Sequence, residues 1–108
     1  MHRAILFLLA AVALNAQDAK NGKVLFETKY RCYTCHGYDG HGGQGARLVP
    51  MKLPQAAFIA YVRNPRQMPA YSAKIVPDAE MADIWTYIKT IPESPDAKSI
   101  PLLSSLMK

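Results

Sequence analysis

Cys32-Tyr33-Thr34-Cys35-His36 decides the fold, because the other informative stretches of the chain can be understood as holding or covering what these residues bind. Two cysteines separated by two residues lie about one helical turn apart and face the same way. A histidine directly after the second cysteine is carried under the same bound group. This C-x-x-C-H pattern is typical of covalent haem, with the cysteines forming thioethers and the histidine ligating the iron.

Other interpretations of the cysteine pair are a redox dithiol, a structural disulfide or half of a zinc site. Zinc would need two more ligands, but the chain has no third cysteine, and only His2 and His41 lie outside the motif. A dithiol oxidoreductase would need a thioredoxin-like pattern of strands and helices, which the sequence does not show. We therefore favour one covalently bound haem c, with a chance disulfide as the main alternative.

Length and composition indicate one small globular domain, because the chain has 108 residues and half of them are apolar. With 13 Lys and Arg against 8 Asp and Glu, the formal net charge is +5. The basic residues form no run and are not interleaved with aromatics, so we expect no nucleic-acid partner. The charge instead suits redox proteins with acidic docking surfaces. The sequence does not indicate an oligomeric state.

The first 16 residues have the pattern of a cleaved signal peptide. Arg3 precedes an apolar run from Ala4 to Leu14, and small and polar residues follow around Ala16. The alternative is an uncleaved anchor, but the run is much shorter than the roughly 20 residues needed to span a bilayer. We therefore expect a periplasmic protein with no stable membrane span. Residues 17–92 would form the folded domain, and residues 93–108 a Pro-containing tail.

Hydrophobic spacing and capping residues predict an all-α fold of three to four short helices and loops wrapped around the haem. The predicted helices are 18–30, a second that starts at Leu53-Pro54 with the proline in its first turn and ends at Asn64-Pro65, and 78–90. The second helix should bury Ala57, Phe58, Tyr61 and Val62.

The last predicted helix carries one apolar stripe, formed by Met81, Ile84, Trp85 and Ile88. Gly22 would allow the first helix to cross it closely, and Phe26 could then meet Trp85 or Ile88. Alternatively, the stripe covers the haem and the second helix. The tail is broken by prolines and could lie on the surface through Leu102, Leu103 and Leu106.

Residues 37–45 contain five glycines in nine positions, which predicts a loop whose backbone passes close to the haem. The stretch lacks the lysine and hydroxyl residue of a phosphate-binding loop. His41 could be a ligand or a pH switch, but we expect a solvated loop residue. The second ring N–H of an iron-bound histidine usually donates a hydrogen bond, and for His36 we expect the Pro50 carbonyl as the acceptor.

A methionine thioether on a proline-bounded loop is a good sixth ligand for haem iron, and Met68 in the stretch Arg66–Tyr71 fits this description. Met51 is the competitor, but only about 15 residues separate it from His36, which leaves little chain to pass around the haem edge. Met81 lies on a helical face, and Met107 lies in the tail.

Together, the C-x-x-C-H motif, Met68-Pro69-x-Tyr71 and the aromatic C-terminal helix resemble the class I c-type cytochromes. This resemblance implies thioethers at Cys32 and Cys35 and axial ligation by His36 and Met68. It also implies the helix crossing at Gly22, a place for Tyr71 near the haem, and a proline such as Pro50 as acceptor for the ligand histidine. The tail weakly resembles that of small cytochromes accompanying periplasmic dehydrogenases.

Iron with both axial positions filled leaves no site for a substrate, so we expect a carrier of single electrons rather than an enzyme. It would connect a donor, such as a dehydrogenase or respiratory complex, with a terminal acceptor. The alternative is a haem sensor or peroxidase-like enzyme in which the sixth position opens. A third possibility is a fixed cytochrome subunit of a larger oxidoreductase.

Overall fold

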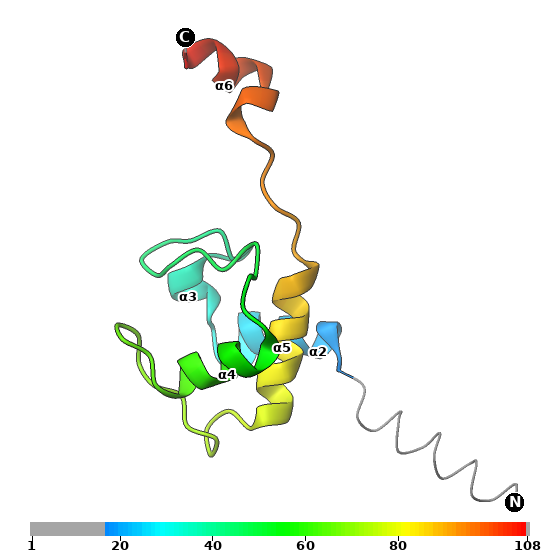
Figure 1. The fold of residues 1–108 in the computed structure, drawn as a ribbon. Helices are drawn as coiled ribbons and strands as arrows, with labels where there is room; N and C mark the ends of the chain where they lie inside the picture. Colours follow the sequence, from blue (N-terminus) through cyan, green and yellow to red (C-terminus); the bar gives the residue numbers. More distant parts are fainter. Residues whose placement is uncertain (1–16, 108) are drawn as a thin grey trace, which may run out of the picture.

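The computed structural model describes residues 17–107, and these form helices and loops with no β-strand among them. In chain order the elements are α2 (Ala19–Val24), the π-helical η1 (Leu25–Lys29), α3 (Tyr33–His36), α4 (Gln55–Arg63), α5 (Asp78–Thr90), the 3₁₀ turn η2 (Ala97–Ser99) and α6 (Pro101–Leu106) (Figure 1). The predicted all-α fold is confirmed. The expected signal peptide, residues 1–16, lies outside the described residues.

The first helix begins where the sequence predicted. Asp18 is its N-cap, and the carboxylate accepts hydrogen bonds from the backbone N–H groups of Lys20 and Asn21. The helix continues from α2 into η1, where the Tyr30 N–H reaches back five residues to the carbonyl of Leu25 at 2.9 Å. It ends there because Arg31 takes a left-handed conformation with φ 53°. The chain thus turns sharply just before Cys32.

The crossing of α2 and α5 forms the centre of the molecule, and Gly22 makes it possible. A Cβ at this position would lie 2.0 Å from the Asp83 carbonyl oxygen and 2.8 Å from the Tyr87 Cβ. One turn further along, the Phe26 ring meets the Tyr87 ring at a centroid distance of 5.6 Å. Phe26 is fully buried. The crossing predicted from Gly22 is therefore present.

The aromatic partner of Phe26 in this crossing is Tyr87 rather than the suggested Trp85. Two residues along a helix differ by about 200°, so Tyr87 and Trp85 lie on nearly opposite sides of α5. The Trp85 indole N–H donates to the Leu53 carbonyl at 3.0 Å, just before α4. Helix α5 therefore packs between α2 on one side and α4 on the other, and its buried stripe of Met81, Ile84 and Ile88 serves both.

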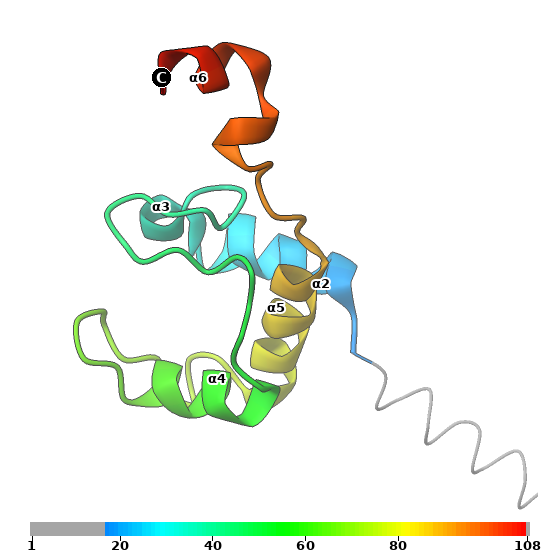
Figure 2. The same ribbon diagram turned by 45° about the horizontal axis from the view of Figure 1, so that its top comes forward.

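Helix α4 ends at Asn64, as expected, but Pro54 is its N-cap rather than part of its first turn. The helix also buries only half of the predicted side. Phe58 and Val62 are buried, whereas Ala57 and Tyr61 are exposed. Both ribbon views place α4 across from α3, with the segment 47–53 running between them (Figures 1 and 2). The loop from residue 64 to 77 then leads back to α5.

The tail was expected to be irregular and to lie on the surface, but it forms α6 and stands apart from the other helices (Figure 2). Pro101 occupies the first turn of α6, where its missing N–H costs nothing, so it starts a helix instead of breaking one. Leu102 and Leu106 are 71% and 74% exposed. Among the described elements, α6 packs chiefly on η2.

Candidate haem site and comparisons with known proteins

The attachment turn consists of Cys32 and α3. The Cys32 carbonyl accepts hydrogen bonds from the N–H groups of Cys35 and His36, at 3.4 and 3.1 Å, so the three candidate residues share one turn. Cys32 lies half-buried against the core, Cys35 is exposed, and both thiols are free. The spacing therefore places two thiols and one imidazole together, as attachment of a haem requires.

Burial raises the pKa of the Cys32 thiol to about 11. A reactive dithiol needs the opposite change, because the thiolate is the nucleophile and is favoured by a lowered pKa. The redox dithiol interpretation therefore loses support. Across residues 17–107, no three side chains of His, Cys, Asp or Glu lie together as the ligands of a metal ion would.

The His36 ring is oriented by main-chain atoms. Its Nδ1 lies 2.6 Å from the Ala46 carbonyl oxygen. With Nδ1–H donating to this oxygen, Nε2 carries the free lone pair that an iron would take. The acceptor is thus Ala46 rather than the expected Pro50.

The position of the Pro50 carbonyl follows from the anchoring of its neighbours. The Leu48 and Val49 N–H groups both donate to the Gly40 carbonyl, at 2.8 and 3.2 Å, and the Val49 side chain is buried. The chain has therefore turned towards the core before it reaches Pro50. The segment of residues 47–53, which contains Pro50, lines a cavity of about 330 Å³. Pro50 belongs to this lining.

The glycine-rich stretch is a loop, as its composition predicted, and its backbone packs against α3. The Gly45 N–H donates to the Cys35 carbonyl at 2.7 Å, and the Gly42 N–H donates to the His36 carbonyl at 2.9 Å. A Cβ on Gly45 would lie 3.0 Å from His36 Cε1 and 3.2 Å from Cys35 Cβ. The loop therefore fits around the imidazole because it lacks side chains there.

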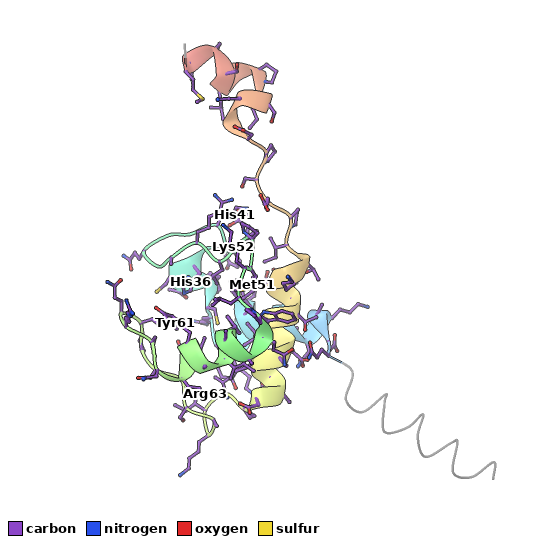
Figure 3. The ribbon with its side chains drawn as sticks, viewed as in Figure 1. His36, His41, Met51, Lys52, Tyr61 and Arg63 are labelled. Carbon is purple, nitrogen blue, oxygen red and sulfur yellow. The ribbon has the colours of Figure 1, made fainter. Side chains whose placement is uncertain are left out.

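His41 is not the solvated loop residue that was expected, because its side chain is only 16% exposed. Its Nε2 accepts the Ser94 N–H at 3.1 Å, and its Nδ1 lies 2.9 Å from the Asp39 carbonyl. The ring thus connects the glycine-rich loop to the start of the tail. Both ring nitrogens of His41 therefore have a partner. Figure 3 shows His41 beside the loop rather than between α3 and α4.

The two candidate methionines differ in their surroundings. Met51 is 8% exposed and belongs to the hydrophobic core, whereas Met68 lies half-buried at the edge of that core. In Figure 3, Met51 lies to the right of His36 and Tyr61, next to α5. Core packing therefore already accounts for Met51, while Met68 lies on the loop of residues 64–77, at the edge of the core.

Tyr71 is also half-buried, and burial is the main reason that the pKa of its hydroxyl is raised. The charges that the Cys32 and Cys35 thiols carry when ionised act in the same direction. This electrostatic effect indicates that Tyr71 lies near the attachment turn. Cys32, Met68 and Tyr71 all pack against the same hydrophobic core.

Arg63 holds this loop, a role that no sequence pattern indicated. Its Nη1 donates to the Tyr71 carbonyl at 2.9 Å, and its Nη2 lies 2.6 Å from Asp78 Oδ1. In addition, the Tyr71 N–H donates to the Val62 carbonyl at 3.2 Å. The end of α4 therefore fixes the middle of the loop.

Comparison with known proteins identifies a family for most of the chain. The family model "Cytochrome C oxidase, cbb3-type, subunit III" matches residues 17–88. The chain belongs to this cytochrome c family. Its members are electron carriers with covalently bound haem c, and the two cysteines of the motif are present here.

Two relatives are named as the cytochrome c subunit of the cytochrome bc1 complex. The protein from Corynebacterium diphtheriae is 30% identical over 76% of this chain and 30% of its own length. The protein from Corynebacterium efficiens is 30% identical over 72% of this chain and 27% of its own length. The chain therefore spans less than a third of these relatives. No solved structure gives a significant match.

The donor set and the space around it fit a covalently bound haem. Two thiols and an imidazole come from one turn, a thioether lies on the opposing loop, and Gly45 leaves room beside the imidazole where a Cβ would crowd it. All four groups are normal partners of haem in proteins. At residues 17–107, no helix is long and apolar enough to cross a membrane.

Proposed function

We propose that this chain is a periplasmic, monohaem electron-transfer protein. In this proposal, Cys32 and Cys35 hold one haem c through thioethers, and His36 and Met68 ligate its iron. The observation that carries the proposal is the arrangement of the attachment turn, where His36 Nδ1 faces the Ala46 carbonyl at 2.6 Å and leaves Nε2 for the metal. The domain would comprise residues 17–92, with residues 93–108 as a tail and residues 1–16 as a signal peptide.

Bound haem c supplies a one-electron couple at its iron. The protein contributes the environment of that couple. A methionine thioether raises the reduction potential relative to a second nitrogen ligand, and burial disfavours the extra charge of the oxidised state. Pro50 and Tyr71 would line the site, Pro50 from the cavity of segment 47–53 and Tyr71 from the Met68 loop.

The partner is proposed to be a respiratory oxidoreductase. The family and both relatives are named for subunits of such complexes. Removal of residues 1–16 takes away Arg3 and would lower the formal charge from +5 to +4, since 12 Lys and Arg then stand against 8 Asp and Glu. This positive charge would steer the chain towards acidic docking surfaces and raise the association rate more than the affinity. Native size, measured in extracts of the source cells, distinguishes a free shuttle from a fixed subunit.

The experiment that tests ligation compares two volume-conserving variants, Met68→Leu and Met51→Leu. The protein is expressed in the periplasm with its haem, and visible spectra of the reduced protein are recorded before and after carbon monoxide. We expect carbon monoxide to leave the spectra of the wild type and of Met51→Leu unchanged, because both axial positions of the iron are taken. Met68→Leu should bind carbon monoxide and have a lower reduction potential, because the thioether ligand is gone.

Two results would contradict this assignment. If Met51→Leu opens the iron and Met68→Leu does not, Met51 is the sixth ligand. If the wild type binds carbon monoxide as readily as Met68→Leu, the sixth position is open, and a haem sensor or peroxidase-like enzyme replaces the electron carrier.

A further inference from the structure

Tyr30 stands at the junction between the first helix and the attachment turn. It is the last residue before Arg31, whose left-handed conformation turns the chain into Cys32. Its backbone N–H is taken by the Leu25 carbonyl, so the side chain leaves the helix end in a fixed direction. Tyr30 therefore moves with the segment that carries both cysteines.

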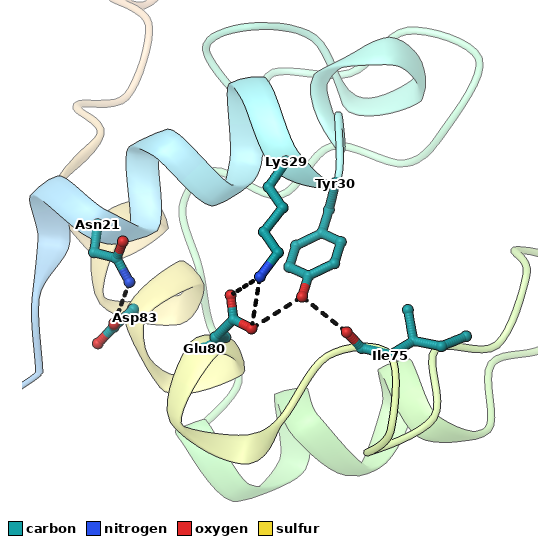
Figure 4. A network of polar contacts seen from close by, with 6 residues as sticks. All are labelled: Asn21, Lys29, Tyr30, Ile75, Glu80 and Asp83. Atoms are coloured by element: carbon teal, nitrogen blue, oxygen red, sulfur yellow. Dashed lines mark hydrogen bonds and ion pairs between the residues drawn. The ribbon is translucent and has the colours of Figure 1, made fainter.

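The Tyr30 hydroxyl reaches two other parts of the molecule. It lies 2.8 Å from the Ile75 carbonyl oxygen and 3.0 Å from Glu80 Oε1 (Figure 4). Lys29 Nζ in turn lies 3.1 and 3.2 Å from the two oxygens of Glu80. The hydroxyl has one proton for these two acceptors, so it bridges the Ile75 carbonyl, which is the nearer, and the Glu80 carboxylate.

Ile75 belongs to the loop of residues 64–77, which also carries Met68. Arg63 and the Val62 carbonyl hold the middle of this loop to α4 at Tyr71. Within residues 17–107, Tyr30–Ile75 is the hydrogen bond that joins the loop to the segment before Cys32. One hydroxyl thus connects the side that binds the haem to the side that would supply the sixth ligand.

The Tyr30 hydroxyl is a stable donor in this place. Burial, and after it the hydrogen bond with Glu80, raise the pKa of Tyr30 above its ordinary value of 10.0. The group therefore keeps its proton throughout the neutral range. The ring also packs against the hydrophobic core, which limits its alternative positions.

We infer that Tyr30 is a positioning residue, which holds the Met68 loop against the attachment turn through its hydrogen bond to the Ile75 carbonyl. The inference rests on the proposed function, because it concerns the ligand that Met68 provides there. Loss of the hydroxyl leaves the thioether in place but increases the fraction of time for which the loop stands away from the iron.

The test compares Tyr30→Phe with Tyr87→Phe in the haem-bearing protein. Tyr87 is a suitable control because it is half-buried in the α2–α5 crossing. Its hydroxyl has no hydrogen-bond partner among residues 17–107. The readouts are the rate of carbon monoxide binding to the reduced protein and the methionine–iron absorption band of the oxidised protein. Unfolding in denaturant is measured in parallel.

We expect Tyr30→Phe to bind carbon monoxide about two- to tenfold faster than Tyr87→Phe and to weaken the methionine–iron band. This range corresponds to about 0.4 to 1.4 kcal/mol, which is the size expected for the loss of one hydrogen bond. Glu80→Gln removes the charge partner of Lys29 but keeps the Tyr30–Ile75 bond, so its carbon monoxide rate should stay within about twofold of wild type.

Equal rates in Tyr30→Phe and Tyr87→Phe would overturn the inference while leaving Met68 as the ligand. An effect of Glu80→Gln as large as that of Tyr30→Phe would also overturn it, because the contact with α5 would then be the important one. Rapid binding by the wild type itself would instead contradict the proposed ligation and remove the basis of the inference.

A measurement on the wild type keeps the inference testable if Tyr30→Phe does not mature. In the reduced, diamagnetic protein, nuclear Overhauser contacts should join the Tyr30 ring protons to Ile75. Their presence would support the hydrogen-bonded arrangement, and their absence would overturn it.

Discussion

His36 is held by main-chain atoms of the glycine-rich loop rather than by neighbouring side chains. The imidazole contacts the Ala46 carbonyl, and Gly45 passes beside it. The sequence predicted that a loop would lie here and that a carbonyl would face His36. It could not identify Ala46, because the acceptor depends on how Leu48 and Val49 are pinned to Gly40, which no local pattern encodes.

Gly45→Ala tests this packing. The new Cβ would lie 3.0 Å from His36 Cε1 and 3.1 Å from Nδ1, so either the imidazole or the loop must shift. We expect a loss of about 1 to 3 kcal/mol in the free energy of unfolding and a change in the haem spectrum. Ala46→Gly, which keeps the carbonyl, is the control and should leave the spectrum unchanged. A wild-type spectrum in Gly45→Ala would show that the loop yields without moving the ligand.

Gly22→Ala should be more damaging, because the clash is with backbone. The added Cβ would come within 2.0 Å of the Asp83 carbonyl oxygen, and only separation of α2 from α5 can relieve this. We expect a loss of about 3 kcal/mol or more in denaturant unfolding. Lys23→Ala, at an exposed position of the same helix, should change stability by less than about 0.5 kcal/mol. Similar stabilities of the two variants would contradict the close crossing.

Elements were predictable where local signals and packing agree. Asp18 caps the first helix, Pro54 and Asn64 bound α4, and Asp78–Thr90 is helical as the stripe predicted. The burial of α4 was only half predictable. Ala57 and Tyr61 fall on its apolar side by spacing, yet they are exposed, because spacing does not say which neighbour covers them.

The loop between α4 and α5 should depend on Arg63 more than on Asp78. The two residues form an ion pair, but the Asp78 side chain is 77% exposed. Ion pairs with so exposed a partner contribute little to the free energy of unfolding. The Arg63 hydrogen bond to the Tyr71 carbonyl is charge-assisted and partly buried. We therefore expect Arg63→Ala to lose about 1.5 to 3 kcal/mol of unfolding free energy, and Asp78→Asn less than about 1 kcal/mol.

Denaturant unfolding of the two variants measures this difference, and carbon monoxide binding shows whether the Met68 loop has loosened. Binding should be faster in Arg63→Ala than in Asp78→Asn. Equal losses in both variants would mean that the ion pair, not the bond to the Tyr71 carbonyl, holds the loop.

On the scale of the whole molecule, the helices of residues 17–91 pack together, whereas α6 contributes little to them. The prolines of the tail indicated a break in the fold, but they could not show that Pro101 would start a helix. A chain ending at Pro95 lacks α6 and η2 and keeps the Ser94 N–H. Its unfolding free energy should stay within about 0.5 kcal/mol of the full chain. A larger loss would show that α6 packs on the domain in solution.

His41 determines where the tail leaves the domain. Its Nε2 accepts the Ser94 N–H at 3.1 Å, while Asp39 holds the other side of the ring. In His41→Ala this acceptor is lost, so residues 92–97 should detach more often and be cleaved faster by a protease. His41→Gln provides a side-chain oxygen as a replacement acceptor and should be cleaved more slowly than His41→Ala. Because the contact lies outside the α2–α5 crossing, the haem spectrum should not change in either variant. Equal cleavage of wild type and His41→Ala would mean that Ser94 is held by other contacts.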